Sequence, residues 1–163
     1  MTTIELLQAQ FNKERMNAQV YQAFANALES ENWPGFAAWM RKASADELIH
    51  AGKFADYLIA RNEIPTSTAL EAPPSMDGNN PVPFFQASLE LEKANTASIL
   101  AIEDQSDEED DEQTDVFLYS WAIEEQTRSE RELVDAILEL KRVGPDGLLI
   151  LDREYGERAA GGG

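Results

Sequence analysis

Hydrophobic side chains recur at alternating steps of three and four along four long stretches of the chain. That spacing places them on one face of an α-helix. The second stretch shows the pattern most completely, at Phe36, Met40, Ala43, Glu47, His50, Phe54 and Tyr57. The others run over residues 7–28, 85–99 and 116–140, and no strand pattern accompanies them. We therefore expect an all-α protein with four long helices.

Each of the four apolar faces is interrupted by a polar residue about one-third to halfway along its length. These residues are Glu14, Glu47 with His50, Glu92, and Gln126 with Glu130. A single glutamate in such a position fits a long side chain that reaches the solvent. Four helices with the same interruption indicate instead one polar layer inside the bundle, because an unpaired buried carboxylate costs several kcal/mol.

The breaks between the helical stretches predict how the helices connect. Asn32-Trp33-Pro34-Gly35 is a short turn that makes the first two helices antiparallel neighbours. Residues 63–83 hold five of the seven prolines and read as a long crossover, which lets helices two and three run parallel. Val143-Gly144-Pro145 ends the fourth helix. We expect one domain, 1–163, made of a bundle (1–143), a short C-terminal helix (145–157) and a flexible tail (159–163).

Composition narrows the function. The 163 residues include no cysteine, which rules out disulfides, thiolate metal sites and cysteine nucleophiles. The net charge of −18 makes nucleic acid and anionic membranes poor partners and cations natural ones, although the charge also serves solubility alone. The first residues, Met1-Thr2-Thr3-Ile4-Glu5, lack the pattern of a signal peptide and no apolar run is long enough to span a membrane, so we expect a cytoplasmic protein.

The chemistry centres on Glu47-Leu48-Ile49-His50. A Glu-x-x-His pair on a buried helix face offers two metal ligands to the interior of a bundle. His50 is the only histidine, so a site of histidines alone is excluded. Three carboxylates, one imidazole and one amide suit paired iron or manganese ions. A carboxylate in the middle of a helix can bridge two such ions about 3.5–4 Å apart.

These residues resemble the non-haem ferritins of the heavy-chain or prokaryotic type, in the ferritin-like di-iron superfamily. The resemblance covers about residues 6–158. The motifs that carry it are Asn12-Lys13-Glu14 with Tyr21, Gly35-Phe36-Ala37, Asp46-Glu47-Leu48-Ile49-His50, Leu91-Glu92-Lys93, Trp121 with Glu124-Glu125-Gln126, and Gly147-Leu148-Leu149-Ile150-Leu151-Asp152. The resemblance implies a ferritin-like up-down four-helix bundle with a short fifth helix.

What the resemblance implies for function is iron storage and detoxification. Such subunits form a hollow shell of 24 copies and oxidise Fe(II) with dioxygen at a di-iron ferroxidase centre, and the ferric mineral collects inside. Carried over to this chain, the first iron takes Glu14, Glu47 and His50, and the second takes Glu47, Glu92 and Gln126. Glu125 and Glu130 are further candidate ligands. Tyr21 matches a tyrosine beside the centre that can donate an electron, and its position also fits a plain core residue.

Departures from the relatives also matter. Many prokaryotic relatives carry a third iron site rich in glutamates on the fourth helix, where this chain has Arg128 and Ser129. We expect no haem site, because Leu48 stands where haem-binding relatives carry a methionine. The haem-binding relatives also carry a second Glu-x-x-His on the fourth helix, and this chain has no second histidine.

Residues 103–112 hold eight acids among ten residues, which fits a solvated turn or a local cation attractor. Asp111, Glu112 and Asp115 are our candidates for steering Fe(II) inward. The run Leu148-Leu149-Ile150-Leu151 is too apolar for the surface of a monomer and predicts burial against a neighbouring subunit.

Two other readings stay open. The first is a di-iron oxidase or oxygenase that keeps its metals and acts on an organic substrate. The second is a silent structural subunit of a mixed shell, against which the intact ligand set argues.

Overall fold

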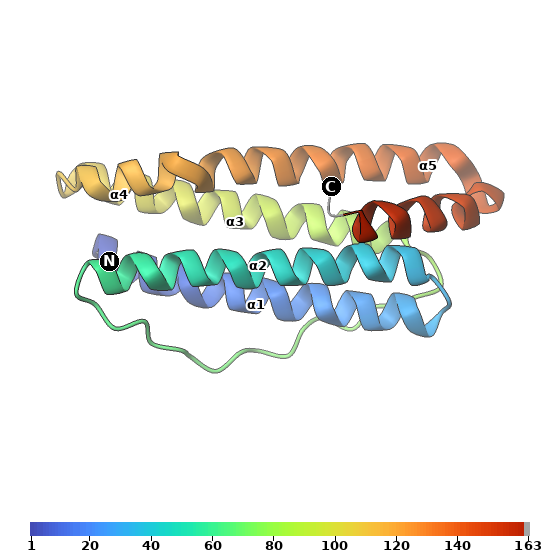
Figure 1. The fold of residues 1–163 in the computed structure, drawn as a ribbon, viewed down its shortest axis with the longest axis horizontal. Coiled ribbons are helices and arrows are strands. Elements are labelled where there is room, and N and C mark those ends of the chain that lie inside the picture. The colour runs from blue at the N-terminus through green and yellow to red at the C-terminus, as the bar shows by residue number, and fades with distance from the viewer. Residues whose placement is uncertain (162–163) are drawn as a thin grey trace.

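The computed structural model describes residues 1–161, and within that range it is helical without strands. The helices are α1 (Thr3–Ser30), α2 (Pro34–Ala60), α3 (Val82–Glu108), α4 (Glu112–Phe117) and α5 (Ile123–Ala160), with a π-helical turn η1 (Leu118–Ala122) between α4 and α5. Figure 1 shows α1, α2, α3 and the series α4–η1–α5 side by side along one long axis. The fold is the expected four-helix bundle. No helix in the described range is both long and apolar enough to cross a membrane.

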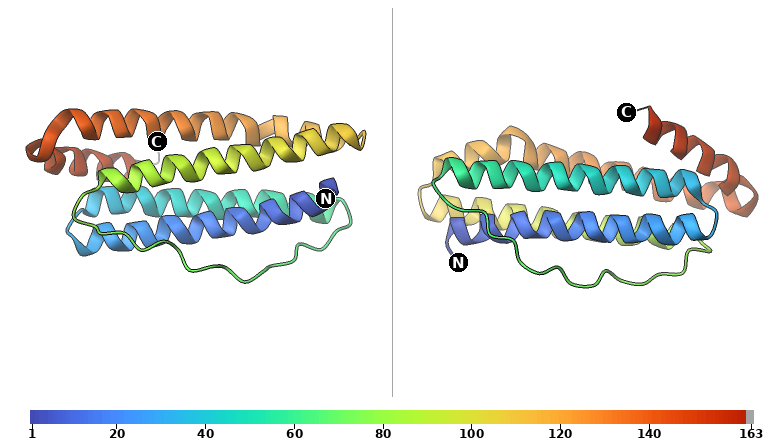
Figure 2. Two further views of the ribbon diagram at one scale, coloured as in Figure 1. Left: turned by 180° about the vertical axis from the view of Figure 1, so that it is seen from behind. Right: turned by 60° about the horizontal axis from the view of Figure 1, so that its bottom comes forward.

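The long connection lies on the outside of the bundle and runs its full length (Figures 1 and 2). It returns the chain to the end where α2 began, so α2 and α3 run parallel, as predicted. Polar side chains of α1 hold it in place: Gln8 Nε2 donates to Ile64 O at 2.7 Å and Asn12 Nδ2 donates to Thr66 O at 2.9 Å. Gln19 continues the series by donating to Glu71 O at 2.8 Å. The outer face of α1 thus satisfies backbone groups that have no secondary structure of their own.

The helices α1, α2 and α3 end in the same way, with a residue in the left-handed conformation just after the helix. Asn32, Asn62 and Asp110 follow the three helices with φ values of 63°, 61° and 54°. In each case the backbone N–H of the residue that follows donates to a carbonyl oxygen of the preceding helix, as when Trp33 N donates to Leu28 O at 3.0 Å. Left-handed residues of this kind usually are glycines, and asparagine and aspartate are the side chains that tolerate the position best.

The expected buried stripe of the fourth helix was wrong at its start. Val116 and Tyr119 are 69% and 60% exposed, and the buried positions are Thr114, Leu118 and Ala122. These three positions are four residues apart. In an ordinary α-helix each step of four residues goes about 40° beyond a full turn, so the three side chains would gradually rotate away from a single face. The π turn η1, in which Ile123 N–H bonds to Leu118 O, absorbs the drift. The turn delivers Gln126 to the core in phase.

The fourth helix changes direction at Gly144, as the sequence predicts. This residue has φ 65° and ψ −178°, a conformation essentially restricted to glycine, and Pro145 follows it. The chain then folds back along the bundle as the C-terminal segment of α5, residues 145–160 (Figure 1). The segment is longer than the expected 145–157, and Ala159 and Ala160 are helical rather than part of a tail. Gly162 and Gly163 lie outside the described residues.

The apolar run of this segment is divided between core and surface. Leu151 is buried and Leu148 packs against the core, which corrects the expectation that the whole run lies exposed on a single subunit. Leu149 and Ile150 remain 61% and 65% exposed. Tyr155 is also buried, with its ring 5.3 Å from that of Phe36. The segment therefore completes the core of the bundle on one face and presents two apolar side chains on the other.

The interior of the bundle consists of two apolar clusters with a polar layer between them. One cluster, around Phe24, Phe36, Phe84 and Leu140, fills the end where α2 and α3 begin. The other, around Phe54, Ile99 and Leu118, fills the opposite end. Between the stretches that contribute to the two clusters lie the buried polar residues Gln10, Glu14 and Asn17 of α1, Ser44, Glu47 and His50 of α2, and Ser88, Glu92 and Asn95 of α3, and Gln126 of α5 lies between Ala122 and Leu133. The polar layer is thus one level of the bundle built by all four helices.

Candidate metal centre

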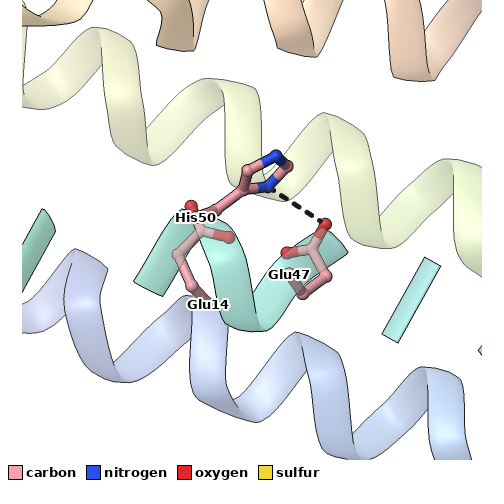
Figure 3. Close-up of side chains that lie close together, drawn as sticks. All are labelled: Glu14, Glu47 and His50. Carbon is pink, nitrogen blue, oxygen red and sulfur yellow. Dashed lines mark ion pairs between the residues drawn. The ribbon is translucent and has the colours of Figure 1, made fainter. Parts of the chain in front are cut away.

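Three side chains converge at the centre of the polar layer. Glu14 projects from α1, and Glu47 and His50 project from α2 toward it (Figure 3). One potential ligand atom of each residue lies within 4.8 Å of the others, and all three residues are buried. Glu47 Oε1 lies 3.7 Å from His50 Nδ1. The i, i+3 spacing on α2 puts the carboxylate and the imidazole one turn apart on the same face.

Glu92 and Gln126 lie in the same layer, from α3 and α5. Tyr21 Oη donates to Glu92 Oε1 at 2.6 Å, and Gln126 Nε2 donates to Glu92 Oε2 at 3.1 Å. Both carboxylate oxygens of Glu92 therefore have a donor. Glu92 and Tyr21 line the same cavity as Glu47 and His50. The structure thus brings the five residues expected as ligands, and Tyr21, to one level of the bundle.

Buried amides connect these carboxylates, and the sequence patterns did not single them out. Asn95 Nδ2 donates to Glu14 Oε1 and to Gln126 Oε1, each at 3.2 Å. Gln10 Nε2 donates to Glu14 Oε1 at 2.6 Å, and Asn17 Nδ2 donates to Glu47 Oε2 at 3.3 Å. Gln10, Asn17 and Asn95 each lie three or four residues from a predicted ligand. A search for polar residues at that spacing would have found them.

The three acids of the layer all have pKa values above the ordinary value of a glutamate. Burial raises the pKa of Glu14 well above its usual range, and the neighbouring Glu47 adds to the effect. Burial also raises the pKa of Glu47, to about 7, with Glu92 adding to the rise and hydrogen bonds opposing it. The pKa of Glu92 is raised by burial too, although Tyr21 and Gln126 stabilise its charge. Three acids close together in a low-dielectric interior cannot all be ionised unless a cation joins them.

This donor set fits divalent transition ions. The carboxylates supply hard oxygen ligands, and the imidazole favours transition ions over calcium. The amides orient the carboxylates from outside the cluster, which is how ligands are held ready for a metal. Glu47 lies beside Glu14 and feels the charge of Glu92, so it occupies the middle of the set. No cysteine is present to compete for the ions.

Glu125 and Glu130, the two further candidate ligands, lie at the edge of the layer. Glu125 Oε1 is 3.8 Å from His50 Nε2, on the opposite side of the ring from Glu47. Glu130 accepts a hydrogen bond from Thr96 Oγ1 at 2.5 Å. Thr96 in turn lies 3.3 Å from Gln126 Nε2, so Glu130 reaches the layer only through another side chain.

The three residues expected to steer Fe(II) have different environments. Asp111 caps α4 and pairs with Arg61 at 2.8 Å. Burial alone would raise the pKa of Asp111, but hydrogen bonds from Arg61 and Thr114 outweigh it and lower the pKa. Asp115 accepts a hydrogen bond from Ser106, and Glu112 is exposed. The charge of Asp111 is therefore already balanced inside the protein.

Comparisons with known proteins agree on one family. The family profile described as "Ferritin-like domain" matches residues 4–143. A bacterial non-heme ferritin of Bacteroides fragilis is 30% identical over 149 residues, which span 91% of this chain and 92% of that protein. The soma ferritin of Lymnaea stagnalis is 32% identical over 148 residues, covering 89% of this chain and 85% of the relative.

Solved structures give the same picture. The open pore ferritin of the hyperthermophilic archaeon Archaeoglobus fulgidus superposes with a TM-score of 0.90 at 32% identity, over 94% of each chain. A form of that ferritin engineered to be closed gives the same TM-score at 31% identity, again over 94% of each chain.

Proposed function

The chain belongs to the ferritin-like domain family, and on that premise we propose that it oxidises Fe(II) with dioxygen in its polar layer and stores the ferric product inside a shell of 24 subunits. The family and the fold support iron storage in general. The observation that carries the more specific proposal is the buried cluster of Glu14, Glu47 and His50.

The buried charge of the polar layer favours a pair of cations. The layer contains three acids that cannot all ionise in the absence of a cation, held by amides that already point their donors at the carboxylate oxygens. Two divalent ions supply the missing positive charge. Glu14 and His50 hold the first ion, Glu92 and Gln126 hold the second, and Glu47 bridges them.

The electron count fits a pair of ions. Each Fe(II) gives up one electron on becoming Fe(III), so two ions and two protons convert one dioxygen to hydrogen peroxide. Tyr21 lies beside the centre, and its hydroxyl donates to Glu92. The phenol can replace one of the two Fe(II) ions as electron donor, with its proton passing to Glu92, so that dioxygen still receives two electrons.

The cavity beside the centre favours small reactants. It has a volume of about 90 Å³ and is lined by Tyr21, Glu47, His50 and Glu92, among others. A site for a drug-sized organic molecule is about 300–1,000 Å³. Dioxygen, water and metal ions fit, whereas a drug-sized organic molecule does not. This observation weighs against the alternative of an oxidase or oxygenase with an organic substrate.

The exposed apolar side chains support assembly. Leu149 and Ile150 on the C-terminal segment, and Leu48 and Ile49 on α2, are each more than half exposed in the single subunit. Exposed aliphatic side chains that lie next to each other are typical of surfaces that contact another protein, and a closed assembly would bury them between copies of the chain. Size-exclusion chromatography with light scattering should give a mass close to 24 times the 18.2 kDa of the chain. A stable monomer would contradict the shell.

The experiment for the chemistry replaces the bridging ligand. Glu47→Gln keeps the size of the side chain and removes its charge, so the bundle should fold with an unchanged circular dichroism spectrum. Even residues that only support a metal ligand change affinity or activity about 10–100-fold when removed. We expect a loss of at least that size in the initial rate of Fe(III) formation when two Fe(II) per subunit meet dioxygen, measured by stopped-flow absorbance.

The matched control is Asp56→Asn, which removes an exposed acid from the same helix and leaves the net charge equal to that of the test variant. Its rate should stay at the wild-type value. If Glu47→Gln oxidises Fe(II) as fast as Asp56→Asn does, the polar layer is not the oxidation site.

A further inference from the structure

The cavity beside the metal centre extends outward between α2 and α5. Its inner part is formed by ligands of the proposed centre, and its outer part is lined by three more acids: Glu132, and two that are direct sequence neighbours of proposed ligands, Asp46 and Glu125. We call Asp46 and Glu125 the outer acids. Asp46 directly precedes Glu47 on α2, and Glu125 directly precedes Gln126 on α5. The outer acids therefore lie next to two proposed ligands without belonging to the buried cluster.

Each outer acid is bound by a basic residue of its own helix. Arg128 Nη2 donates to Glu125 Oε1 at 2.6 Å and to Oε2 at 2.7 Å. Lys42 Nζ donates to Asp46 Oδ2 at 2.9 Å. Lys42 and Arg128 line the same cavity.

Glu125 lies at the edge of the centre. Its Oε1 is 3.8 Å from His50 Nε2, on the side of the ring away from Glu47. Its side chain is 21% exposed, whereas that of Arg128 is 63% exposed. The carboxylate is thus a partly buried group, and both of its oxygens are occupied by an arginine that reaches in from the surface.

We propose that Arg128 is a specificity-determining residue that serves as a built-in counter-ion for Glu125 and limits the subunit to two bound metal ions. This inference rests on the proposed function, because it takes the two-ion centre as given. A guanidinium that contacts both oxygens satisfies a carboxylate well, and a divalent ion must displace it before Glu125 can serve as a ligand. Without Arg128, the cavity contains a free carboxylate beside an imidazole and a second acid.

The test counts metal ions rather than turnover. Metal-free, full-length assembled protein is titrated without oxygen with Co(II), whose visible absorption reports its ligands. Wild type should bind two Co(II) per subunit. Arg128→Gln should bind a third, at least about tenfold more tightly than any further ion on wild type, because the substitution leaves one uncompensated negative charge in a partly buried cavity. Tenfold corresponds to about 1.4 kcal/mol.

Two further variants make the result specific. Arg131→Gln removes an arginine from the same helix that pairs with Asp135 at 2.9 Å outside the cavity, so it changes the net charge equally. It should keep two ions. Adding Glu125→Gln to Arg128→Gln should return the count to two, because the new ligand is gone.

The outcomes separate this inference from the proposed function. Two ions on both wild type and Arg128→Gln, or three on wild type, overturn the role of Arg128 and leave the two-ion centre intact. A third ion that persists in the double variant also overturns it, since Glu125 is then not the ligand. Fewer than two ions on wild type contradicts the proposed function itself.

Discussion

The N-terminus of α2 takes its cap from a residue more than a hundred positions away. Trp33, at the N-cap position, makes no side-chain cap hydrogen bond. Instead Phe36 N donates to Asp152 Oδ1 at 2.8 Å, in a buried contact between α2 and the C-terminal segment. The two backbones are in close contact there, since a Cβ on Gly35 would lie 1.6 Å from Asp152 O. We therefore expect Asp152→Ala to weaken the docking of the C-terminal segment.

The expected loss in the free energy of unfolding can be bounded from three typical contributions to such a contact. A hydrogen bond to a charged group contributes about 1.5–3 kcal/mol. Loss of an N-cap side chain costs about 0.5–2 kcal/mol. The interaction of a carboxylate with the helix dipole contributes about 0.3–1 kcal/mol. These describe the same contact and are not additive, so Asp152→Ala should lower the free energy of unfolding by about 2 kcal/mol. Asp152→Asn keeps an acceptor oxygen and should lose about 0.5–1 kcal/mol, the share that depends on charge.

The assay is urea unfolding followed by circular dichroism at one fixed protein concentration, because assembly also contributes to apparent stability. Glu154→Ala is the control, since Glu154 lies two residues away on the exposed side of the same segment. Limited proteolysis near Gly144 gives a second readout, which should be faster in Asp152→Ala. Equal unfolding curves and equal cleavage rates for Asp152→Ala and Glu154→Ala would refute the reasoning.

Three further predictions concern the polar layer, the acidic run and the exposed apolar residues of the C-terminal segment. Gln126→Glu adds a carboxylate to the ligands of the proposed second ion, so anaerobic Fe(II) titration should show tighter binding there and metal analysis should show more iron retained after one round of oxygen. Glu112→Gln with Asp115→Asn should slow Fe(II) oxidation at low salt and lose this effect at high salt, because screening shortens to about 8 Å at physiological ionic strength; a rate unaffected at low salt assigns the acidic run to a solvated turn. Leu149→Ser with Ile150→Ser exposes less apolar surface and should shift the size-exclusion mass toward smaller species, while an intact shell would show that these side chains are not interface residues.

Much of the architecture could be predicted from the sequence, because the relevant information is local. The stripe through Phe36, Glu47 and Phe54 defines a helix and its buried face without reference to any other part of the chain. Gly144 and Pro145 mark a change of direction through their own backbone preferences. The recurrence of polar residues on four such stripes predicts one shared layer, and the structure places Glu14, Glu92 and their partners at that level.

The fourth helix shows where local periodicity fails. Both Val116 and Leu118 fit an apolar position, and the choice between them depends on a π turn that the pattern does not reveal. The turn lies between α4 and α5. It allows Thr114 on α4 and Gln126 on α5 to be buried in the same core. Only the packing of the other three helices imposes the requirement that both be buried.

The sequence by itself determined that the chain forms four long helices, their order, the crossover and the residue types of the candidate metal centre, because amphipathic spacing and turn residues act within a few positions. Only the tertiary structure decided which amides orient the carboxylates, that Asp152 caps α2, and that Arg128 binds Glu125 beside His50. These contacts depend on rotamers and on the exact level at which the helices pack. Hydrogen bonds act over about 3 Å, so a shift of one helical turn, about 5.4 Å, would break every one that joins two helices.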